Sequence, residues 1–425
     1  MIKSIEGNFV NFDRSFYGRV ELDSKTGLIE KIAEPLGEAD LVVENGLIFP
    51  GFVDLHVHVR EDPSKKQTYK EDFQTASKAA LHGGVVCALD MPNNPEPPVD
   101  EKTYLAKKKL AEGKPVDFVL YAGVKPGSTP LSLHVPYKVF MAHSVGDLFF
   151  KNFDQLEKTL SLYRGQAVSF HCEDPELISK TKRPPEAEIS AIGFALFLIQ
   201  RYELQGNICH CSTKAGIEKI KEAKRKGVRV TCEVTPHHLY FDETLLDNKN
   251  RKWLRVNPPI RTATDRKALL DALREGTIDY LASDHAPHTK HEKDDNQLAG
   301  ETGSAGMPHL DTYGNVVTWL MAEQDFSAKD IARVCAYNPG QFVNQFTQTK
   351  YGKITEGYAG SFTVIDPKRP MVVLEKDLQT KCGWSPFSGV EFPGQVLYTV
   401  QKGEIAYESN ASRSSSKAAG REGAA

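Results

Sequence analysis

Two histidines and an arginine stand at alternate positions in the stretch GFVDLHVHVRED, residues 51–62. In an extended segment successive side chains point to opposite faces, so Asp54, His56, His58 and Arg60 share one face and the intervening apolar residues share the other. A face that only meets water does not need imidazoles. Two neutral ring nitrogens at one strand end suit a divalent metal such as zinc. The spacing therefore predicts part of a metal site, and a structural role for both histidines is the alternative.

Polar side chains also end the apolar segments that follow along the chain. They are Asn93 in ALDMPNN, Lys138 in YKVFM, His171 in SFHCED, His210 in ICHCST, Glu233 in TCEVTPHH and Asp284 in ASDHAPH. Any one of them could be an ordinary hydrogen-bonded core residue. Their recurrence at the ends of successive predicted strands indicates one shared site, provided that the fold brings those ends together.

Lys138 is the unusual member of this set, because an ammonium has no lone pair and repels a cation. If its amine took up carbon dioxide, the resulting carbamate would be an anionic oxygen ligand able to bridge two metals. The alternative is an ion pair with Asp284 or Glu233. Two metals about 3.5–4 Å apart could share a hydroxide of lowered pKa. Asp284, beside that hydroxide, is then the natural proton carrier.

The elements that must position these groups repeat one theme between residues 51 and 345, in which a short apolar strand is followed by a helical segment. Eight strands are predicted, at residues 52–58, 85–91, 118–122, 137–141, 167–172, 208–212, 228–234 and 278–284. Helical spacing of apolar residues is clear in STKAGIEKIKEAKRKG and TDRKALLDALREG. Eight such units predict an α/β fold, a (β/α)8 TIM barrel with its site at the carboxyl ends of the strands. An open doubly wound sheet would have a glycine-rich turn after its first strand, which HVHVREDP is not.

The two ends of the chain read differently from its middle. Residues 1–50 and 352–408 carry short strand patterns punctuated by Gly, with little helical period. We expect them to pair as one small β-sandwich domain built from both termini, with residues 51–351 as the catalytic barrel. Residues 409–425 are rich in Ser, Ala and Gly and are expected to be a disordered tail.

Composition excludes several classes of partner. Hydrophobic residues make up 40% and charged residues 26%, as in soluble globular proteins. Lys and Arg number 53 against 56 acidic residues, so no basic field exists for nucleic acid or anionic membrane. No apolar run approaches the roughly 18 residues of a membrane span. Seven scattered cysteines fit reduced thiols, and a cytoplasmic protein is expected.

These segments together resemble one family of enzymes. GFVDLHVHVRE, MPNN, HCED, CHCSTKAG, VTCEVTPHHL, VNPPIR, ASDHAPHT and CGWSPFSG are similar, in order and over nearly the whole chain, to segments of dihydroorotases in the amidohydrolase superfamily of metal-dependent barrels. The resemblance implies zinc, with two ions per subunit. The implied ligands are His56, His58 and Asp284 for one ion, His171 and His210 for the other, and carboxylated Lys138 as the bridge.

The resemblance also implies a substrate and its contacts. The implied reaction is the reversible hydrolysis of the cyclic amide of (S)-dihydroorotate to N-carbamoyl-L-aspartate, the third step of de novo pyrimidine synthesis, with Asp284 as the catalytic residue. Arg60, Asn93, Asn257 and His288 are implied as substrate contacts, and the backbone near Ala305 and Gly306 could add to them. A ring carboxylate calls for a guanidinium and a few amide or imidazole donors.

Two kinds of departure and two rival functions stay open at this point. The residues EDP after Arg60 replace the EPG of many relatives, and KVFMAHSVGDL fits only some branches of the family. The nearest rival is another cyclic amidohydrolase, such as a hydantoinase, dihydropyrimidinase or allantoinase. The other is a non-catalytic scaffold that binds aspartate carbamoyltransferase. Association with that enzyme, or into a homodimer, could also accompany activity.

Overall fold

Eight parallel strands form a closed ring in the computed structural model, which describes residues 1–143, 148–179, 182–247, 250–294, 304–410 and 412. The strands are β5 (Phe52–Val57), β6 (Val85–Asp90), β7 (Asp117–Leu120) with its continuation β8 (Ala122–Gly123), β9 (Tyr137–Phe140), β10 (Ala167–His171), β11 (Gln205–Ile208), β12 (Val230–Val234) and β13 (Tyr280–Leu281). Each pairs in parallel with the next along the chain. A parallel bridge between Val57 and His285 joins the segment that follows β13 to β5 and closes the ring. The predicted barrel is confirmed.

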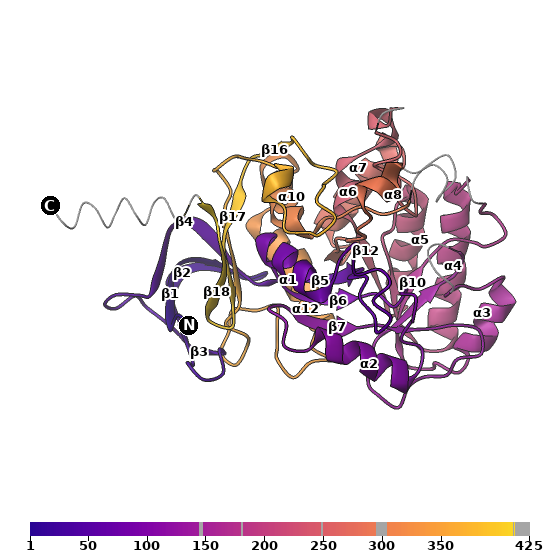
Figure 1. Cartoon of the computed structure of the whole chain (residues 1–425), viewed down its shortest axis with the longest axis horizontal. Helices are drawn as coiled ribbons and strands as arrows, with labels where there is room; N and C mark the ends of the chain where they lie inside the picture. The colour runs from indigo at the N-terminus through magenta and orange to yellow at the C-terminus, as the bar shows by residue number, and fades with distance from the viewer. Residues whose placement is uncertain (144–147, 180–181, 248–249, 295–303, 411, 413–425) are drawn as a thin grey trace.

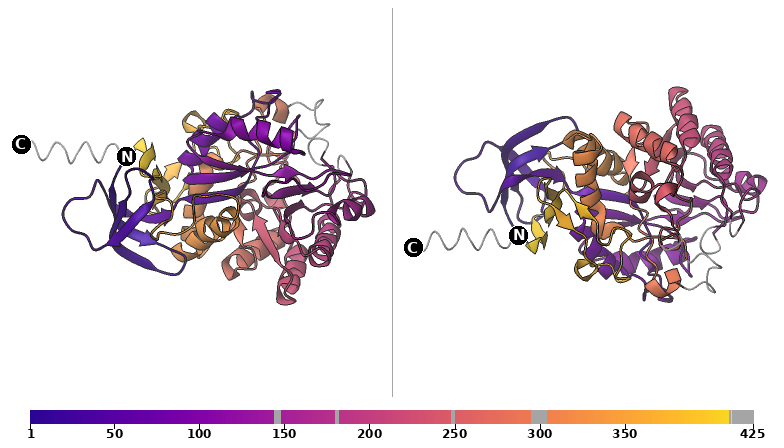
Figure 2. Two further views of the ribbon diagram at one scale, coloured as in Figure 1. Left: turned by 90° about the horizontal axis from the view of Figure 1, so that it is seen from below. Right: turned by 90° about the horizontal axis from the view of Figure 1, so that it is seen from above.

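Helices surround this ring, as Figures 1 and 2 show. They are α1 (Phe73–His82), α2 (Glu101–Ala111), α3 (Phe153–Leu160), α4 (Pro185–Arg201), α5 (Lys214–Arg225), α6 (Pro236–Tyr240), α7 (Ala263–Glu275), α8 (Lys290–Asp294), α10 (Tyr313–Glu323), α11 (Ala328–Ala332) and α12 (Asn338–Val343). The side chains of Asp72, Thr213 and Thr262 cap α1, α5 and α7 by accepting a backbone N–H of the first turn. These short polar side chains explain why each helix begins directly after a strand-end loop.

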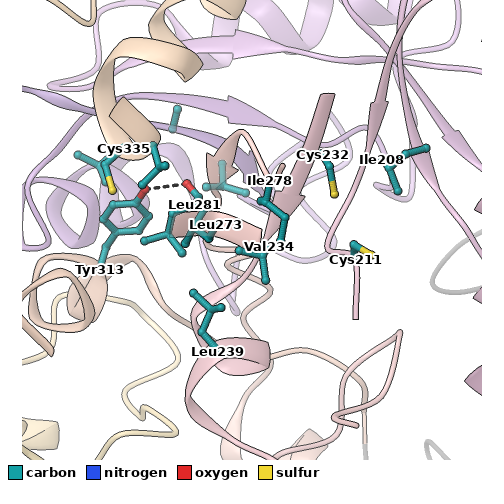
Figure 3. Packing of buried hydrophobic residues seen from close by; sticks show 14 of the residues in the cluster. Ile208, Cys211, Cys232, Val234, Leu239, Leu273, Ile278, Leu281, Tyr313 and Cys335 are labelled. Carbon is teal, nitrogen blue, oxygen red and sulfur yellow. Dashed lines mark hydrogen bonds between the residues drawn. The ribbon is translucent and has the colours of Figure 1, made fainter. Parts of the chain in front are cut away.

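The buried faces of the helices pack on the outside of the strands. Ile217 and Ile220 of α5, like Leu269 and Leu273 of α7, are buried as their spacing predicts. Figure 3 shows the part of this core between β11, β12 and β13 and their neighbours. There the hydroxyl of Tyr313 donates to the carbonyl of Leu281 at 2.7 Å, which fixes α10 against the last strand.

A second sheet is built from both ends of the chain and lies beside the barrel (Figure 1). It contains β1 (Ser4–Val10), β2 (Ser15–Leu22), β3 (Ile29–Ala33), β4 (Leu41–Pro50), β14 (Phe362–Asp366), β17 (Gln395–Gln401) and β18 (Glu404–Glu408) in the order β18-β17-β14-β4-β1-β2-β3. A separate pair joins β15 (Met371–Val372) to β16 (Glu391–Phe392). Only Gly51 separates β4 from β5, and a Cβ there would lie 2.4 Å from Cγ2 of Val86. The domain boundaries at residues 50 and 352 stay predictions, and most of the predicted tail lies outside the described residues.

The strand boundaries differ from the prediction at two places that matter for the site. The strand predicted at residues 208–212 is β11, which ends at Ile208, and the strand predicted at residues 278–284 is the short β13. His210 and Asp284 therefore follow their strands, with φ values of 35° and 45°, and Arg60 has a φ of 68°. Residues other than glycine rarely adopt this left-handed backbone conformation, because it is strained. Backbone strain of this kind concentrates at functional sites. The turn at each residue ends the strand and redirects the side chain.

Two expectations from composition can be compared with the fold. All seven cysteines are free and buried, as predicted for reduced thiols. In the described part of the chain, no helix combines the length and apolar character needed to cross a membrane.

Candidate active site

Two histidines and a carboxylate meet where the ring of strands closes. His56 lies on β5, His58 follows that strand directly, and Asp284 follows β13. Oδ1 of Asp284 lies 3.0 Å from Nε2 of His58 and 3.3 Å from Nε2 of His56. All three side chains are buried, and their ligand atoms lie within 4.8 Å of one another. Residues more than 220 positions apart thus form one cluster of metal-ligand type.

A second pair of histidines adjoins this cluster. His171 ends β10 and His210 lies two residues beyond β11, and Nδ1 of His171 is 2.9 Å from Nε2 of His210. The ring centre of His210 lies 5.2 Å from that of His56. The five side chains from four strands therefore form one continuous group of nitrogen and oxygen donors.

Lys138, on β9, is fully buried beside this group. Its Nζ donates to Sγ of Cys209 at 2.7 Å and lies 5.3 Å from the centre of the Phe140 ring. Among the described residues, neither Asp284 nor Glu233 comes within ion-pair distance of Nζ. The described residues therefore show no direct ion pair between Lys138 and either carboxylate.

Three of the four histidines use their other ring nitrogen to bind an acceptor. The pairs are His56 Nδ1 with Glu233 Oε1 at 2.5 Å, His58 Nδ1 with Asn93 Oδ1 at 2.7 Å, and His171 Nε2 with Glu173 Oε2 at 2.7 Å. An N–H donated at one nitrogen leaves the lone pair on the other, which is how metal-binding histidines are oriented. In each of these histidines the free lone pair faces the common group.

Burial sets the charge of these side chains. Burial lowers the pKa of His56. It lowers the pKa of His58 well below the ordinary value, with the charge of Arg60 as a further cause. It does the same to His210, with His171 as a further cause. Burial also raises the pKa of Asp284. Neutral imidazoles are the form that binds a metal, whereas a protonated ring has no lone pair to offer.

Asp54, on the same strand face, joins the two strands at the closing seam. Its Oδ1 accepts the backbone N–H groups of His56 at 3.1 Å and Ser283 at 3.0 Å. Burial raises the pKa of this carboxyl to about 7. Asp54 thus fixes the backbone beside His56 and lies outside the donor group itself.

The donor group fits a divalent metal such as zinc by its chemistry. A tetrahedral zinc site with bonds of about 2.1 Å separates neighbouring ligand atoms by about 3.4 Å. The separations of 2.9 to 3.3 Å between the facing nitrogen and oxygen atoms are close to that value. His56, Cys209 and Glu233 form a further group of ligand atoms within 4.8 Å. Glu233 already accepts from His56, so its carboxylate orients a ligand in the present geometry.

A cavity opens above the donor group. Its wall contains four of the histidines and Asp284, together with the predicted substrate contacts Arg60, Asn93 and Asn257 and the backbone at Ala305 and Gly306. His288 does not line the cavity directly, but its Nε2 lies 3.5 Å from a guanidinium nitrogen of Arg60. The N–H of Gly306 donates to the carbonyl of Arg255 at 2.9 Å, so it is not free to bind a substrate.

Several residues around the cavity were not predicted from the sequence. Glu173 orients His171 and also pairs with Arg183. The spacing His-x-Glu in SFHCED was the available signal, because alternate residues of a strand share a face. Lys70 donates to Nδ1 of His288 at 3.4 Å and pairs with Glu292 at 2.7 Å. These two contacts join residues more than 210 positions apart and left no pattern in the sequence.

Comparison with protein families gives a match over most of the chain. The model of the amidohydrolase family matches residues 47–148 and 199–406. His171 falls between the two matched ranges, and the other five residues of the predicted metal set fall within them.

Individual relatives extend the match to nearly the full length. A dihydroorotase of Pyrococcus abyssi is 35% identical over 412 residues, covering 95% of this chain and 94% of the relative. A dihydroorotase of Aquifex aeolicus is 31% identical, covering 96% of this chain and 100% of the relative. Among solved structures, the L-hydantoinase of Arthrobacter aurescens superposes with a TM-score of 0.85 at 23% identity, and the match covers 96% of both chains. At that identity the likeness speaks for the fold alone.

Proposed function

The chain belongs to the amidohydrolase family and, within it, to the dihydroorotases, and from this membership we propose its reaction. It catalyses the reversible hydrolysis of the cyclic amide of (S)-dihydroorotate to N-carbamoyl-L-aspartate. This is the third step of de novo pyrimidine synthesis. The single observation that carries the substrate is the position of Arg60, whose guanidinium lines the same cavity as the histidines and Asp284.

Arg60 is suited to the carboxylate that distinguishes dihydroorotate from the substrates of other cyclic amidohydrolases. A guanidinium offers planar, paired donors that match a carboxylate. Asn93 uses its Oδ1 to accept from His58, so its amide N–H groups are left for the ligand. Asn257 lines the same wall. Hydantoin, dihydrouracil and allantoin carry no ring carboxylate and would leave the buried Arg60 without an anion.

We assign the metal-binding roles as the donor set suggests. His56, His58 and Asp284 would hold one zinc ion, His171 and His210 a second, and Lys138, carboxylated on Nζ, would lie between them. When bound, zinc polarises a carbonyl oxygen and lowers the pKa of a water molecule. The oriented lone pairs of three histidines and the absence of an ion pair at Lys138 among the described residues support this assignment.

Asp284 is the proposed proton carrier. Its buried carboxylate lies at the cavity wall, and burial raises its pKa toward the range in which a carboxyl both takes and gives a proton. In hydrolysis Asp284 takes a proton from the attacking water and passes it to the ring nitrogen as the C–N bond breaks. In cyclisation it takes a proton from the ureido nitrogen as that nitrogen attacks the side-chain carboxyl. Arg60 keeps the substrate carboxylate in place in both directions.

One assay tests the proposal against its nearest rivals. The purified protein, supplied with zinc, is offered dihydroorotate, hydantoin, dihydrouracil and allantoin under identical conditions. We expect turnover of dihydroorotate and at least a hundredfold lower kcat/KM for the other three. Turnover of hydantoin or dihydrouracil without turnover of dihydroorotate would assign the chain to another cyclic amidohydrolase activity. No turnover of any substrate by zinc-loaded protein would favour a scaffold role.

Association and location stay predictions. The expected partners beyond the substrate are a second copy of the chain or aspartate carbamoyltransferase, and the expected location is the cytoplasm. Size-exclusion chromatography of the protein alone, and mixed with aspartate carbamoyltransferase, tests both associations.

A further inference from the structure

Lys293, on the short helix α8, is a fully buried lysine. Its Nζ donates to the backbone carbonyls of Ser304 at 2.8 Å, Gly306 at 3.0 Å and Arg255 at 3.4 Å. Lys290, one turn earlier, is half exposed and pairs with Glu375 on the surface. In the described part of the chain no carboxylate lies within 4 Å of Nζ of Lys293. Three carbonyl oxygens therefore replace the water that a charged amine normally needs.

The three carbonyls belong to the two backbone segments that form one wall of the active-site cavity. Val256 and Asn257 follow Arg255, and Ala305 stands between Ser304 and Gly306. The N–H of Gly306 also donates to the carbonyl of Arg255, which joins the two segments to each other. The side chain of Lys293 thus holds both segments. It lies 38 residues along the chain from Arg255 and 11 from Ser304.

Trp384 extends this arrangement to a third segment. The Nζ of Lys293 lies 5.5 Å from the centre of the Trp384 ring, within the range of a cation–π contact. The indole N–H of Trp384 donates to the backbone carbonyl of His288 at 2.7 Å. Lys293 and Trp384 together therefore support the backbone at residues 255–257, 304–306 and 288, from which the predicted substrate contacts Asn257 and His288 project.

The contact to Ser304 determines how the next peptide N–H is directed. In a planar trans peptide the C=O and the N–H point in opposite directions. Because the Ser304 carbonyl points to Lys293, the N–H of Ala305 points away from Lys293. Among the described residues this N–H has no partner, whereas that of Gly306 is bound by Arg255. Ala305 lines the cavity, so its N–H is the backbone donor left for a ligand.

We propose that Lys293 is a positioning residue for the substrate, which acts by holding residues 304–306 so that the Ala305 N–H and the Asn257 side chain face the bound molecule. The inference rests on the proposed function, because the ligand in question is dihydroorotate or N-carbamoyl-aspartate. Lys293 does not touch the substrate itself.

The test compares Lys293→Met with Lys290→Met in the zinc-loaded, full-length protein. Methionine keeps most of the side-chain volume and removes the donors, and Lys290 is a matched lysine of the same helix with an exposed side chain. We expect Lys293→Met to raise the KM for dihydroorotate by about tenfold while kcat stays within about twofold, as for the loss of uniform binding. Bound zinc should be unchanged. Lys290→Met should behave as the unchanged protein.

Hydrogen exchange measured by mass spectrometry separates positioning from a general loss of stability. Lys293→Met should increase exchange at least about fivefold in peptides that cover residues 304–309 and leave peptides that cover residues 52–58 unchanged. In the unchanged protein, N-carbamoyl-aspartate should slow exchange in the same 304–309 peptides. An unchanged KM in folded Lys293→Met overturns the inference.

Two further outcomes remain: Lys293→Met fails to fold, or the unchanged protein fails to hydrolyse dihydroorotate. If Lys293→Met does not fold, Lys293→Gln, which keeps N–H donors, takes its place with an intermediate KM expected. If neither variant folds, absence of ligand protection at residues 304–309 in the unchanged protein overturns the inference. If the unchanged protein does not hydrolyse dihydroorotate, the proposed function fails, and the exchange comparison without ligand still decides whether Lys293 orders residues 304–306.

Discussion

The Nζ of Lys138 lies 2.7 Å from Sγ of Cys209, and among the described residues no carboxylate lies within 4 Å of that Nζ. Burial, with Glu233 as a further cause, raises the pKa of the Cys209 thiol well above its usual value, so the sulfur is neutral. Burial removes the water that an ammonium at this position would need, and the neutral thiol does not supply an opposite charge in its place. An amine in this position is better placed to react with carbon dioxide than to remain an ion-pair partner.

Replacing Lys138 with Ala should therefore remove both metal and activity. We expect bound zinc to fall below one ion per chain and kcat to fall at least about a hundredfold. Loss of a group that orients a metal ligand already costs about 10- to 100-fold, and here the proposed ligand itself is lost. Acetate or propionate should restore part of both, since a small carboxylate can occupy the space of the carbamate. The measurements are zinc content by elemental analysis and dihydroorotate hydrolysis with and without the added acid.

Cys209→Ser is the matched control for this experiment. It changes the neighbour of Lys138 and leaves the amine in place, so zinc content and kcat should change less than about fivefold. Full activity of Lys138→Ala without any added acid would rule out a role for a carbamate on this lysine.

Replacing Asp284 with Asn keeps the shape of the side chain and removes its ability to carry a proton. We expect kcat to fall by about a thousandfold or more, as for other general acid–base residues. Binding of N-carbamoyl-aspartate, measured by calorimetry, should weaken less than tenfold. Zinc content must be measured alongside, because Asp284 is also a proposed ligand. Turnover within tenfold of the unchanged protein would mean that another group carries the proton.

His238 should make the stability of the fold dependent on pH. Burial lowers its pKa to about 4, and its Nε2–H donates to the carbonyl of Pro258 at 3.1 Å. Its pKa in the unfolded chain is about 6.5, so between pH 6.5 and 4 the unfolded chain binds the extra proton and the folded protein does not. The contribution of neutral His238 to the stability of the fold is therefore fully present above pH 6.5 and is lost as the pH falls toward 4.

The expected loss is on the order of 3 kcal/mol in the free energy of unfolding. Other buried histidines contribute in the same direction, so the comparison is made with His238→Gln, whose amide can still donate to Pro258. Urea unfolding of metal-free protein at pH 7 and pH 4.5 should show a smaller fall for His238→Gln than for the unchanged chain. Equal falls for the two proteins would show that His238 does not contribute.

The sequence predicted which residue types gather at the carboxyl ends of the strands. Alternation placed His56, His58 and Arg60 on one face, and eight strand-helix units predicted the ring that brings Asp284 to them. The turn at each strand end was not predicted: Arg60, His210 and Asp284 adopt positive φ values, which no local pattern in their neighbours requires. That strain is stabilised by contacts formed only in the closed barrel, such as the bond from the His58 N–H to the His285 carbonyl.

The two lysines that support the cavity wall, Lys70 and Lys293, could not be predicted from the sequence either. Lys70 and Lys293 stand in polar, lysine-containing stretches of ordinary composition, QTYKED and KHEKDD, which read as solvated surface. In the structure Lys70 is nearly buried and Lys293 is fully so. Their partners lie far along the chain or are backbone carbonyls. Every residue type has a backbone carbonyl, so the sequence does not show which carbonyl accepts a hydrogen bond. Only the three-dimensional fold distinguishes Lys293 from the exposed Lys290.

Lys70 should determine which nitrogen of His288 carries the ring proton. When Lys70 donates to Nδ1 of His288, the ring proton lies on Nε2, and this N–H faces a guanidinium nitrogen of Arg60 at 3.5 Å as donor to donor, an arrangement that an anion between the two groups would satisfy. Burial lowers the pKa of His288 to about 3, so the ring is neutral and presents an N–H donor beside the guanidinium. A substrate carboxylate there can bind both groups.

Replacing Lys70 with Met should reverse this arrangement. Without the ammonium, Oε2 of Glu292, 3.8 Å from Nδ1 of His288, becomes the nearest partner and draws the proton to Nδ1. Nε2 then presents a lone pair to the substrate carboxylate and repels it. Burial and Arg60 still hold the pKa of His288 low in this variant, so the ring stays neutral.

The predicted signature of Lys70→Met is therefore a KM defect without a kcat defect. We expect the KM for dihydroorotate to rise about tenfold at both pH 8.5 and pH 6, because burial keeps the His288 ring neutral at both, with kcat within about twofold of the unchanged protein. Lys66→Met, which changes an exposed lysine of the same stretch, should leave the KM unchanged. A KM within twofold of the unchanged protein in folded Lys70→Met would mean that Lys70 does not set the proton of His288.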